Sequence, residues 1–283
     1  MRTLLLTFAA TLLCAGAYAA DPELYCADLT YDGFTTRSYT FATRGDRTLV
    51  LEIDLTERGD ASGPRPFVVY VPGGSWRTCG IGAFRRQSAY LASPGIAGVR
   101  IVYSLVGDGA DFSAGLEELQ AARDLVAARA GELGLDTLRF GYVAASAGTP
   151  LAADEALSQA GCRFFVGYNG IYDLTRRIDG SRFPEEGTPY LAPFSDGELR
   201  DFSPVNRIGA DPPAVALFHG RADRTISWKQ SQLFCDAVRA ADGRAEIVLY
   251  DDARHGFFNY GKSDYHEEVT RKTAAFIFSV LGE

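Results

Sequence analysis

The chain has 283 residues, of which 47% are hydrophobic and 23% are charged, values that are ordinary for a globular protein. Its formal net charge of -8 at pH 7 argues against binding to nucleic acid or to an anionic membrane surface, because both partners require a basic face. The length suits one α/β domain as well as two small ones.

The first 20 residues have the pattern of a cleavable export signal. Arg2 supplies a positive charge, residues 4–13 form an apolar run, and Ala17-Tyr18-Ala19 is a small-residue cleavage pattern. The apolar run is too short to span a bilayer as a helix. We therefore expect a mature chain of residues 21–283 without a membrane span, either secreted or periplasmic.

Four cysteines remain after such a cleavage, and an even number of cysteines in an exported chain predicts two disulfides. Of the three pairings that four cysteines allow, we favour Cys26–Cys79 and Cys162–Cys235, with buried free thiols as the alternative. No cysteine and histidine have the spacing of a zinc site, and we expect neither a metal nor a cofactor.

Short runs of strand character alternate with helical segments along the mature chain. The predicted strands are residues 38–42, 49–54, 66–71, 99–103, 139–143, 163–168, 214–218 and 246–250. The predicted helices are residues 112–130, 151–160, 229–240 and 266–281. A hairpin turn at residues 44–47 joins the first two strands, and several later strands are apolar throughout, as strands buried on both faces are. This order predicts one α/β domain with an eight-stranded, mostly parallel sheet, antiparallel strands at one edge, and flanking helices.

The strand at residues 139–143 leads into Ala144-Ala145-Ser146-Ala147-Gly148, which is followed by a helix. A strand, a sharp turn with a serine at its tip, and then a helix is the geometry of a nucleophile elbow. The usual pattern is Gly-x-Ser-x-Gly, because crowding at the turn requires small residues two before and two after the serine. Ala144 and Gly148 are both small, although Ala144 departs from the pattern.

An acid and a histidine also follow predicted strands, in the chain order Ser146, Asp223, His255. In an open parallel sheet, function collects at the carboxyl ends of the strands. A serine hydroxyl needs a base to become a nucleophile, and a carboxylate orients that base. We therefore predict Ser146 as nucleophile, His255 as base and Asp223 as acid, with Asp251 and Asp252 as less suitable acids because they lie too close to His255 along the chain.

The two other histidines of the chain are expected to be outside the chemistry. His219 stands at a strand end before Gly220 and is expected to be a structural histidine bonded to the loop backbone. His266 stands at the start of the last helix and is expected to be a solvated surface residue.

An attacked carbonyl becomes an oxyanion, which preorganised N–H donors stabilise. The backbone N–H of Ala147, directly after the nucleophile, is one predicted donor. Gly74 and Ser75 are the others, in the Pro72-Gly73-Gly74-Ser75-Trp76 turn that follows the third strand.

These motifs resemble the esterase/lipase branch of the α/β-hydrolase superfamily, and in particular secreted carbohydrate esterases that remove acetyl or feruloyl groups from xylan. The resemblance runs from about Leu49 to the C-terminus. It rests on Pro72-Gly73-Gly74-Ser75-Trp76, Tyr103-Ser104-Leu105, the elbow, Gly170-Ile171-Tyr172-Asp173-Leu174, Ser203-Pro204, His219-Gly220-Arg221-Ala222-Asp223 and His255-Gly256-Phe257. Pro72 and Ser75 replace a histidine and a glycine of the branch, so the oxyanion loop is expected to differ in shape.

The leading hypothesis is an exported serine esterase that acts through an acyl-enzyme on short-acyl or carbohydrate-linked esters. Residues expected to line its cleft are Trp76, Tyr172, Trp228 and Phe257. Residues 173–204 are expected to form an excursion over the active-site face. The alternative enzyme is a peptidase of the prolyl oligopeptidase kind. The missing propeller domain and the small residues around Ser146 count against it. A non-catalytic binding protein is the other alternative, although no member of the triad is missing.

Overall fold

The computed structural model describes residues 33–56, 63–175, 178, 181–183 and 188–282. The predicted export signal and Cys26 lie outside these residues. Among the described residues, no helix combines the length and apolar character needed to cross a membrane.

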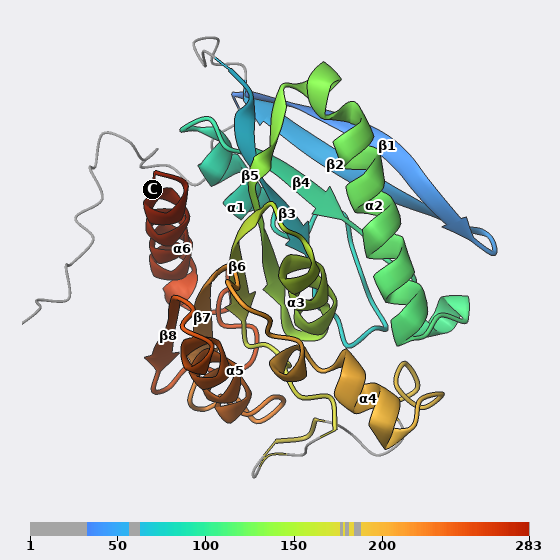
Figure 1. The fold of residues 1–283 in the computed structure, drawn as a ribbon, viewed down its shortest axis with the longest axis vertical. Coiled ribbons are helices and arrows are strands. Elements are labelled where there is room, and N and C mark those ends of the chain that lie inside the picture. The colour runs from blue at the N-terminus through green and yellow to red at the C-terminus, as the bar shows by residue number, and fades with distance from the viewer. Residues whose placement is uncertain (1–32, 57–62, 176–177, 179–180, 184–187, 283) are drawn as a thin grey trace, which may run out of the picture.

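All eight predicted strands are confirmed, and they form one sheet in the order β1-β2-β4-β3-β5-β6-β7-β8 (Figure 1). The strands are β1 (Phe34–Arg44), β2 (Arg47–Thr56), β3 (Arg65–Val71), β4 (Ala97–Ile101), β5 (Leu135–Ala145), β6 (Cys162–Tyr168), β7 (Ala214–Gly220) and β8 (Ala245–Tyr250). The β1–β2 and β2–β4 pairs are antiparallel, and the pairs from β4 through β8 are parallel. The antiparallel pairs therefore lie at one edge, as predicted, and the parallel strands end together on one side.

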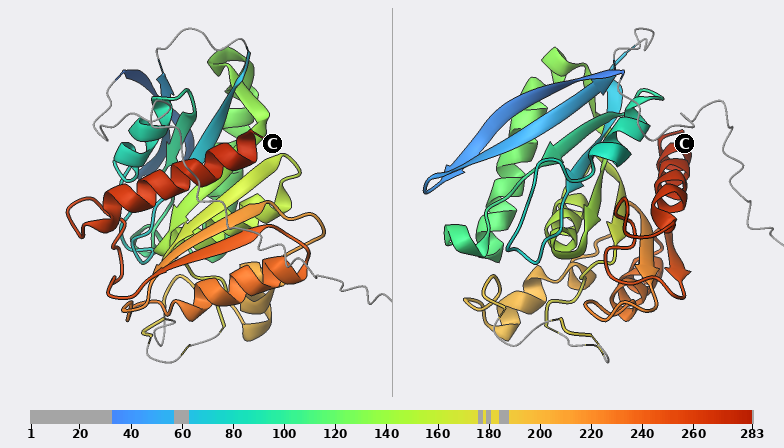
Figure 2. Two further views of the ribbon diagram at one scale, coloured as in Figure 1. Left: turned by 90° about the vertical axis from the view of Figure 1, so that its left-hand side faces the viewer. Right: turned by 180° about the vertical axis from the view of Figure 1, so that it is seen from behind.

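Helices cover both faces of this sheet (Figure 2). Alternate strand residues point to opposite faces, so Val69 and Tyr142 pack into one core while Val68 and Val143 pack into the other. Helices α2 (Phe112–Leu133), α3 (Thr149–Ser158) and α5 (Lys229–Ala240) contribute to the first core, and α1 (Arg85–Ala92) and α6 (Tyr265–Leu281) contribute to the second.

The four predicted helices are confirmed, but α1 and α4 (Asp196–Phe202) were not expected. The buried part of α1 follows two arginines and a loop containing Gly80 and Gly82, so no long apolar stripe marks it. Helix α4 buries no residue and begins at a capping box, in which Ser195 and Glu198 bond each other's backbone N–H groups. That Ser-x-x-Glu pattern was the available sequence signal.

The predicted Cys162–Cys235 disulfide is wrong, because both residues are buried free thiols. Cys162 opens β6, where it pairs with β5 and its thiol contacts the Phe164 carbonyl oxygen at 3.4 Å. Cys235 lies on the buried side of α5, which packs on β7 and β8 instead. Cys79 is also a free thiol, and its predicted partner Cys26 lies outside the described residues.

A buried ion pair joins the antiparallel edge of the sheet to α1. The Arg100 guanidinium on β4 donates from Nε and Nη2 to the Asp54 carboxylate on β2, at 2.7 and 3.0 Å. Asp54 and Arg100 are 0% and 1% exposed, and the Ser88 hydroxyl of α1 donates to Asp54 at 2.6 Å. Arg100 also donates to the Ile81 carbonyl oxygen, which lies in the loop before α1. The pair therefore fixes that loop relative to the sheet.

A second buried carboxylate, Glu155 on α3, leads to a prediction about stability and pH. Burial raises the pKa of Glu155 to about 7, although Arg123 at 3.2 Å acts in the opposite direction. The unfolded chain releases this proton at pH ~4.3. Stability therefore falls as the pH rises from the unfolded to the folded pKa, because only the unfolded state has become ionised.

We expect the Glu155→Gln variant to escape this loss. The difference in the free energy of unfolding between Glu155→Gln and the wild type should grow in favour of the variant as the pH rises from 4.5 to 7.5. The expected gain is up to about 3 kcal/mol, because each unit of pKa shift corresponds to ~1.4 kcal/mol. Urea unfolding at a series of pH values measures the difference, with Ser158→Ala on the same helix as a variant that removes no carboxylate. A difference between Glu155→Gln and wild type that does not change with pH would contradict the prediction.

Candidate active site

Ser146 lies at the turn between β5 and α3, and its backbone is strained. Its φ of 48° is in the left-handed region, which is costly for a residue with a side chain. The Thr149 hydroxyl holds the turn by donating to the Ser146 carbonyl oxygen at 2.6 Å and accepting from the Ile171 N–H at 2.8 Å. A Cβ at position 148 would lie 2.4 Å from the Pro72 carbonyl oxygen, so only glycine fits there. These features give the elbow geometry that the sequence predicts.

The structure brings Ser146, His255 and Asp223 into one hydrogen-bonded chain. The Ser146 Oγ atom is 3.0 Å from Nε2 of His255, and Nδ1 of His255 is 2.7 Å from Oδ2 of Asp223. A carboxylate can only accept, so Nδ1 carries the proton and Nε2 is free to accept from the serine hydroxyl. The three residues follow β5, β8 and β7, respectively, at the carboxyl ends of the strands.

The Asp223 carboxylate is buried and remains ionised. Burial raises the pKa of Asp223, but hydrogen bonds from His219 and His255 lower it more, so that the pKa lies well below its usual range. Its Oδ1 atom accepts from the N–H groups of Thr225 and Ile226 at 2.8 and 3.0 Å. The carboxylate is therefore fixed in position and can stabilise a protonated His255.

His219 is fully buried behind Asp223, and it bonds the loop backbone as expected. Its Nε2 atom lies 3.0 Å from the Ile226 carbonyl oxygen, which can only accept, and 3.4 Å from Oδ2 of Asp223. Its Nδ1 atom lies 2.7 Å from the Ser231 hydroxyl, which donates to it. His219 thus has a structural role, and it also contacts the carboxylate of Asp223.

The expectation that His266 is solvated is wrong. Only 4% of the residue is exposed, and its Nδ1 atom is bonded to the Phe258 carbonyl oxygen at 2.7 Å, because the loop after β8 folds back over α6. Asp251 and Asp252, the less suitable acids, are both exposed, and Asp251 pairs with Arg221 at 3.0 Å.

The loop after β3 faces the elbow. Gly74, Ser75 and Trp76 have successive positive φ values of 126°, 55° and 54°. The Gly74 carbonyl oxygen accepts from the N–H groups of Arg77 and Thr78 at 2.9 and 3.0 Å, which closes the turn. Gly74 and Ser75 line the same cavity as Ser146, so the backbone of this loop lies beside the nucleophile.

Position 74 requires glycine, and this gives a second prediction. A Cβ on Gly74 would lie 1.9 Å from the Thr78 carbonyl oxygen and would occupy an unfavourable φ. We expect Gly74→Ala to displace the loop and to lower kcat/KM for an ester by about 10²–10³, the cost of losing one oxyanion donor. Steady-state hydrolysis measures this, with Gly107→Ala as the control, since a Cβ at 107 meets no atom within 4 Å. Full activity of Gly74→Ala would show that this loop supplies no donor to the oxyanion.

Two cavities of unequal size meet at Ser146 and Ser75. The larger has a volume of about 880 Å³ and the smaller of about 130 Å³. His255 lines only the larger cavity, and Ala147 lines only the smaller. Described residues of the predicted excursion, including Arg182 and Phe183, line the smaller cavity beside Ser146.

Only one of the four aromatic residues predicted to line the cleft does so. Trp76 lines the smaller cavity and stacks on Tyr190, with ring centroids 5.2 Å apart. Tyr172 stacks on Phe234 within a core, at 4.5 Å, and Phe257 packs in the opposite core. Trp228 is half-buried beneath Arg221. Tyr172, Trp228 and Phe257 line neither cavity, because the chain turns them away from Ser146 after each strand ends.

Asn169 also lies at the site, although its sequence context did not predict it there. It follows β6, has a φ of 37°, is fully buried, and lines the larger cavity. Its Oδ1 atom accepts from the N–H of Gly256, next to His255, at 3.3 Å. The available signals were its position at a strand end and the Asn169-Gly170 pair, since asparagine tolerates a left-handed backbone.

The chain matches two family models. Residues 117–283 match the prolyl oligopeptidase family, and residues 53–173 match the family named BD-FAE.

Among curated proteins, the chain is similar to a probable isoprenylcysteine alpha-carbonyl methylesterase of Oryza sativa subsp. japonica (27% identity, covering 77% of this chain and 58% of that protein). It is also similar to esterase LipQ of Mycobacterium tuberculosis (27% identity, covering 72% of this chain and 54% of that protein). The chain thus spans little more than half the length of these relatives.

Among solved structures, the apo form of Thermogutta terrifontis esterase 2 superposes with a TM-score of 0.74 at 23% identity, covering 88% of this chain and 95% of that chain. The same esterase phosphonylated by sarin superposes with a TM-score of 0.73 at 22% identity, covering 88% and 96% of the two chains. With the sheet order and the flanking helices, these similarities confirm the predicted α/β-hydrolase fold.

Proposed function

The chain belongs to the prolyl oligopeptidase family, and we propose that within it the protein is a serine hydrolase that cleaves carboxylic esters through an acyl-enzyme. The observation that carries the proposal is the chain of hydrogen bonds from Ser146 through His255 to buried Asp223, at 3.0 and 2.7 Å. The esterase names of the curated relatives support ester substrates.

In the first half of the reaction, the Ser146 Oγ atom attacks the carbonyl carbon of the ester. His255 Nε2 accepts the serine proton as the Oγ–carbon bond forms, and Asp223 stabilises the resulting imidazolium. The carbonyl oxygen becomes negatively charged, and the backbone N–H groups of Gly74, Ser75 and Ala147 are proposed to donate to it. The ester C–O bond then breaks, and His255 gives its proton to the departing alcohol oxygen.

In the second half, water replaces the alcohol. His255 takes a proton from the water molecule as its oxygen attacks the acyl carbon, the bond to Ser146 Oγ breaks, and the proton passes to the serine. The products are a carboxylic acid and the original enzyme. We propose short-acyl esters, carbohydrate-linked esters included, as the natural substrates, because the smaller cavity at Ser146 is only about 130 Å³.

Peptide hydrolysis is the second candidate, and the match of residues 117–283 to the prolyl oligopeptidase family favours it. The same triad cleaves amides in principle, because the acyl-enzyme is common to both reactions. A proline must then fit beside Ser146. Glycyl-proline 4-nitroanilide tests this directly: release of 4-nitroaniline at a rate comparable to that of an ester would favour the peptidase.

The test of the ester proposal is pre-steady-state hydrolysis of 4-nitrophenyl acetate by the purified protein. We expect a burst of 4-nitrophenol stoichiometric with enzyme, followed by slower turnover, if deacylation limits the rate. Mass spectrometry of the quenched protein should find an acetyl group on the peptide that contains Ser146. A folded protein that releases no 4-nitrophenol and gains no acetyl group would refute the proposal.

We also propose that the protein is exported, on the basis of the charge, apolar run and cleavage pattern in residues 1–20. N-terminal sequencing of the protein recovered from periplasm or medium should begin near residue 20 or 21. Full-length protein confined to the cytoplasm would contradict export.

A further inference from the structure

We propose that the natural substrate joins a small acyl group to a larger alcohol portion that carries an anionic group, a carboxylate or a phosphate. This inference rests on the proposed esterase function and concerns which end of the ester occupies each cavity at Ser146. Its basis is the unequal size of the two cavities, the position of His255 in one of them, and the charge of the residues that line them.

The position of His255 orients the substrate. The departing alcohol oxygen must lie near His255, because that residue donates its proton to it. His255 lines the larger cavity and not the smaller one. The alcohol portion therefore occupies the larger cavity, and the acyl chain extends into the smaller cavity beside Ala147.

The two volumes set the sizes of the two ends. The smaller cavity, of about 130 Å³, favours a short acyl chain over a bulky one. The larger cavity, of about 880 Å³, is in the range of cavities that enclose whole small-molecule ligands.

The charge of the larger cavity is opposite in sign to that of the chain. Arg85 and Arg86 line it, and among the described residues no aspartate or glutamate does. In the part of the chain that the structure describes, neither arginine forms an ion pair. Within the described structure, the cavity thus holds two cations that form no ion pair and no acidic residue, which in a chain of net charge -8 favours an anionic ligand.

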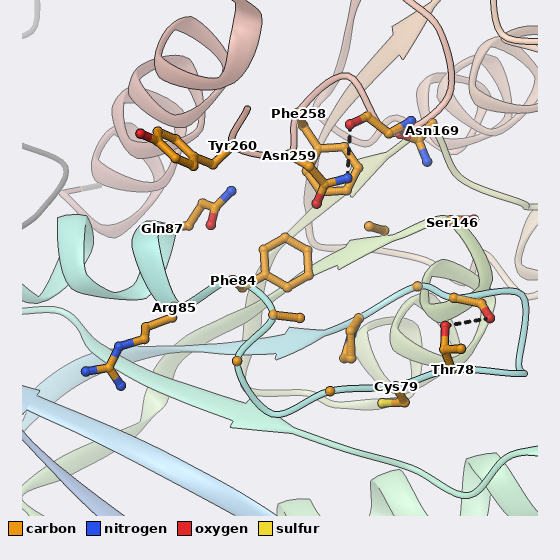
Figure 3. Close-up of a pocket in the computed structure, with 18 of the residues that line it drawn as sticks. Thr78, Cys79, Phe84, Arg85, Gln87, Ser146, Asn169, Phe258, Asn259 and Tyr260 are labelled. Atoms are coloured by element: carbon orange, nitrogen blue, oxygen red, sulfur yellow. Dashed lines mark hydrogen bonds between the residues drawn. The ribbon is translucent and has the colours of Figure 1, made fainter. Parts of the chain in front are cut away.

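Both arginines stand at the start of α1, at a distance from the nucleophile. Figure 3 shows Ser146 and Asn169 toward one end of the cavity and Arg85, Gln87 and Tyr260 toward the other. The Arg86 guanidinium lies 3.6 Å above the centre of the Tyr260 ring. Stacking on a ring orients the guanidinium while its N–H edge stays available for the paired oxygens of a carboxylate or phosphate.

The walls of the larger cavity also hold two buried polar atoms to which the described residues supply no hydrogen-bond partner. Asn169 and His266 line it and are 0% and 4% exposed. Neither Nδ2 of Asn169 nor Nε2 of His266 has a hydrogen-bond partner among the described residues. Unpaired buried polar atoms are costly, so their presence around one cavity is consistent with a polar ligand that satisfies them.

The experiment compares 3-acetoxybenzoate with 3-acetoxybenzamide, two acetate esters that differ in the charge of the alcohol portion. We expect the wild type to prefer the anionic ester about tenfold in kcat/KM, which corresponds to ~1.4 kcal/mol. An Arg85→Gln/Arg86→Gln double variant should lose most of this preference. Arg86→Lys, which keeps the charge, should retain part of it. Arg163→Gln, an exposed arginine at the opposite end of the sheet, should leave the ratio of the two rates unchanged.

The possible results separate this inference from the proposed function. If the wild type hydrolyses neither ester nor 4-nitrophenyl acetate, the esterase function itself fails. If both esters are hydrolysed equally, or the double variant keeps the wild-type preference, the esterase stands and the anionic alcohol is refuted. Adding 3-acetoxyphenyl phosphate to the series determines whether phosphate or carboxylate is preferred.

A final comparison tests the orientation of the substrate. Arg77 and Arg182 line the smaller cavity, so an anion on the acyl side is the competing arrangement. Faster hydrolysis of 4-nitrophenyl hydrogen succinate than of 4-nitrophenyl butyrate would place the anion there and overturn the inference. We expect the butyrate ester to be the better of the two substrates.

Discussion

The Ser146→Ala variant is expected to lose the burst of 4-nitrophenol and at least about 10⁴ of kcat/KM, because removing a triad nucleophile leaves only binding and oxyanion stabilisation. The structure ties this expectation to one atom. Ser146 Oγ is the group hydrogen-bonded to His255 Nε2, and it is common to the linings of both cavities. No acetyl group should be found on the variant after exposure to 4-nitrophenyl acetate.

The fold should tolerate this change. Alanine keeps a Cβ and therefore the same backbone strain at a φ of 48°, and the Thr149 hydrogen bonds of the turn involve only the backbone of residue 146. We expect the Tm to shift by no more than about 2 °C, less than a ΔΔG of 1 kcal/mol produces in a domain of this size. Ser158→Ala, on the helix that follows, controls for loss of a hydroxyl. Undiminished hydrolysis by Ser146→Ala would remove this serine from the mechanism.

The largest loss of stability is expected from Asp54→Asn. The variant removes the charge that compensates Arg100, which is 1% exposed, and breaking a buried ion pair costs about 3–5 kcal/mol. Hydrogen bonds from Thr36 and Ser88 to the carboxylate, at 2.7 and 2.6 Å, would be weakened as well. Guanidinium chloride unfolding measures the change in free energy.

Glu52→Gln is a matched control for this variant. Glu52 pairs with the same arginine at 2.7 Å but is 24% exposed, so that water replaces much of the lost interaction. We expect it to cost less than about 1 kcal/mol, in the range of exposed pairs. Similar losses in the two variants would mean that the buried pair has no special role in holding the antiparallel edge.

The strands could be predicted from the sequence because a strand that is buried on both faces consists of a continuous run of apolar residues. Residues 66–71 and 164–168 are apolar runs, and both lie in central strands, β3 and β6. The candidate nucleophile, base and acid could be found for a related reason: each lies within five residues of the end of a predicted strand, and the ends of parallel strands meet at one edge. The three residues lie close together at that edge because of the sheet topology, and the alternation of strands and helices along the chain predicts that topology.

Features that depend on the path of a loop could not be predicted in the same way. Phe257 and Phe258 both pack into the same core, yet only Phe258 also lines the larger cavity. His266 is buried because a loop eight residues earlier folds back onto it. The Cys162–Cys235 pairing failed for a similar reason, since cysteine spacing does not tell on which strands a helix packs: Cys235 lies on α5, which packs on β7 and β8, whereas Cys162 lies on β6.

The spacing of the hydrogen-bonded residues along the chain has a consequence for the order of events in folding. Ser146 and His255 are 109 residues apart, and His255 is 32 residues from Asp223. Contacts so distant in sequence form late, because closing a long loop costs entropy before the contact repays it. During synthesis or refolding, the elbow and its strands can assemble before the loop after β8 is in place. Recovery of hydrolysis would therefore lag behind recovery of secondary structure, and activity would report the last step of folding.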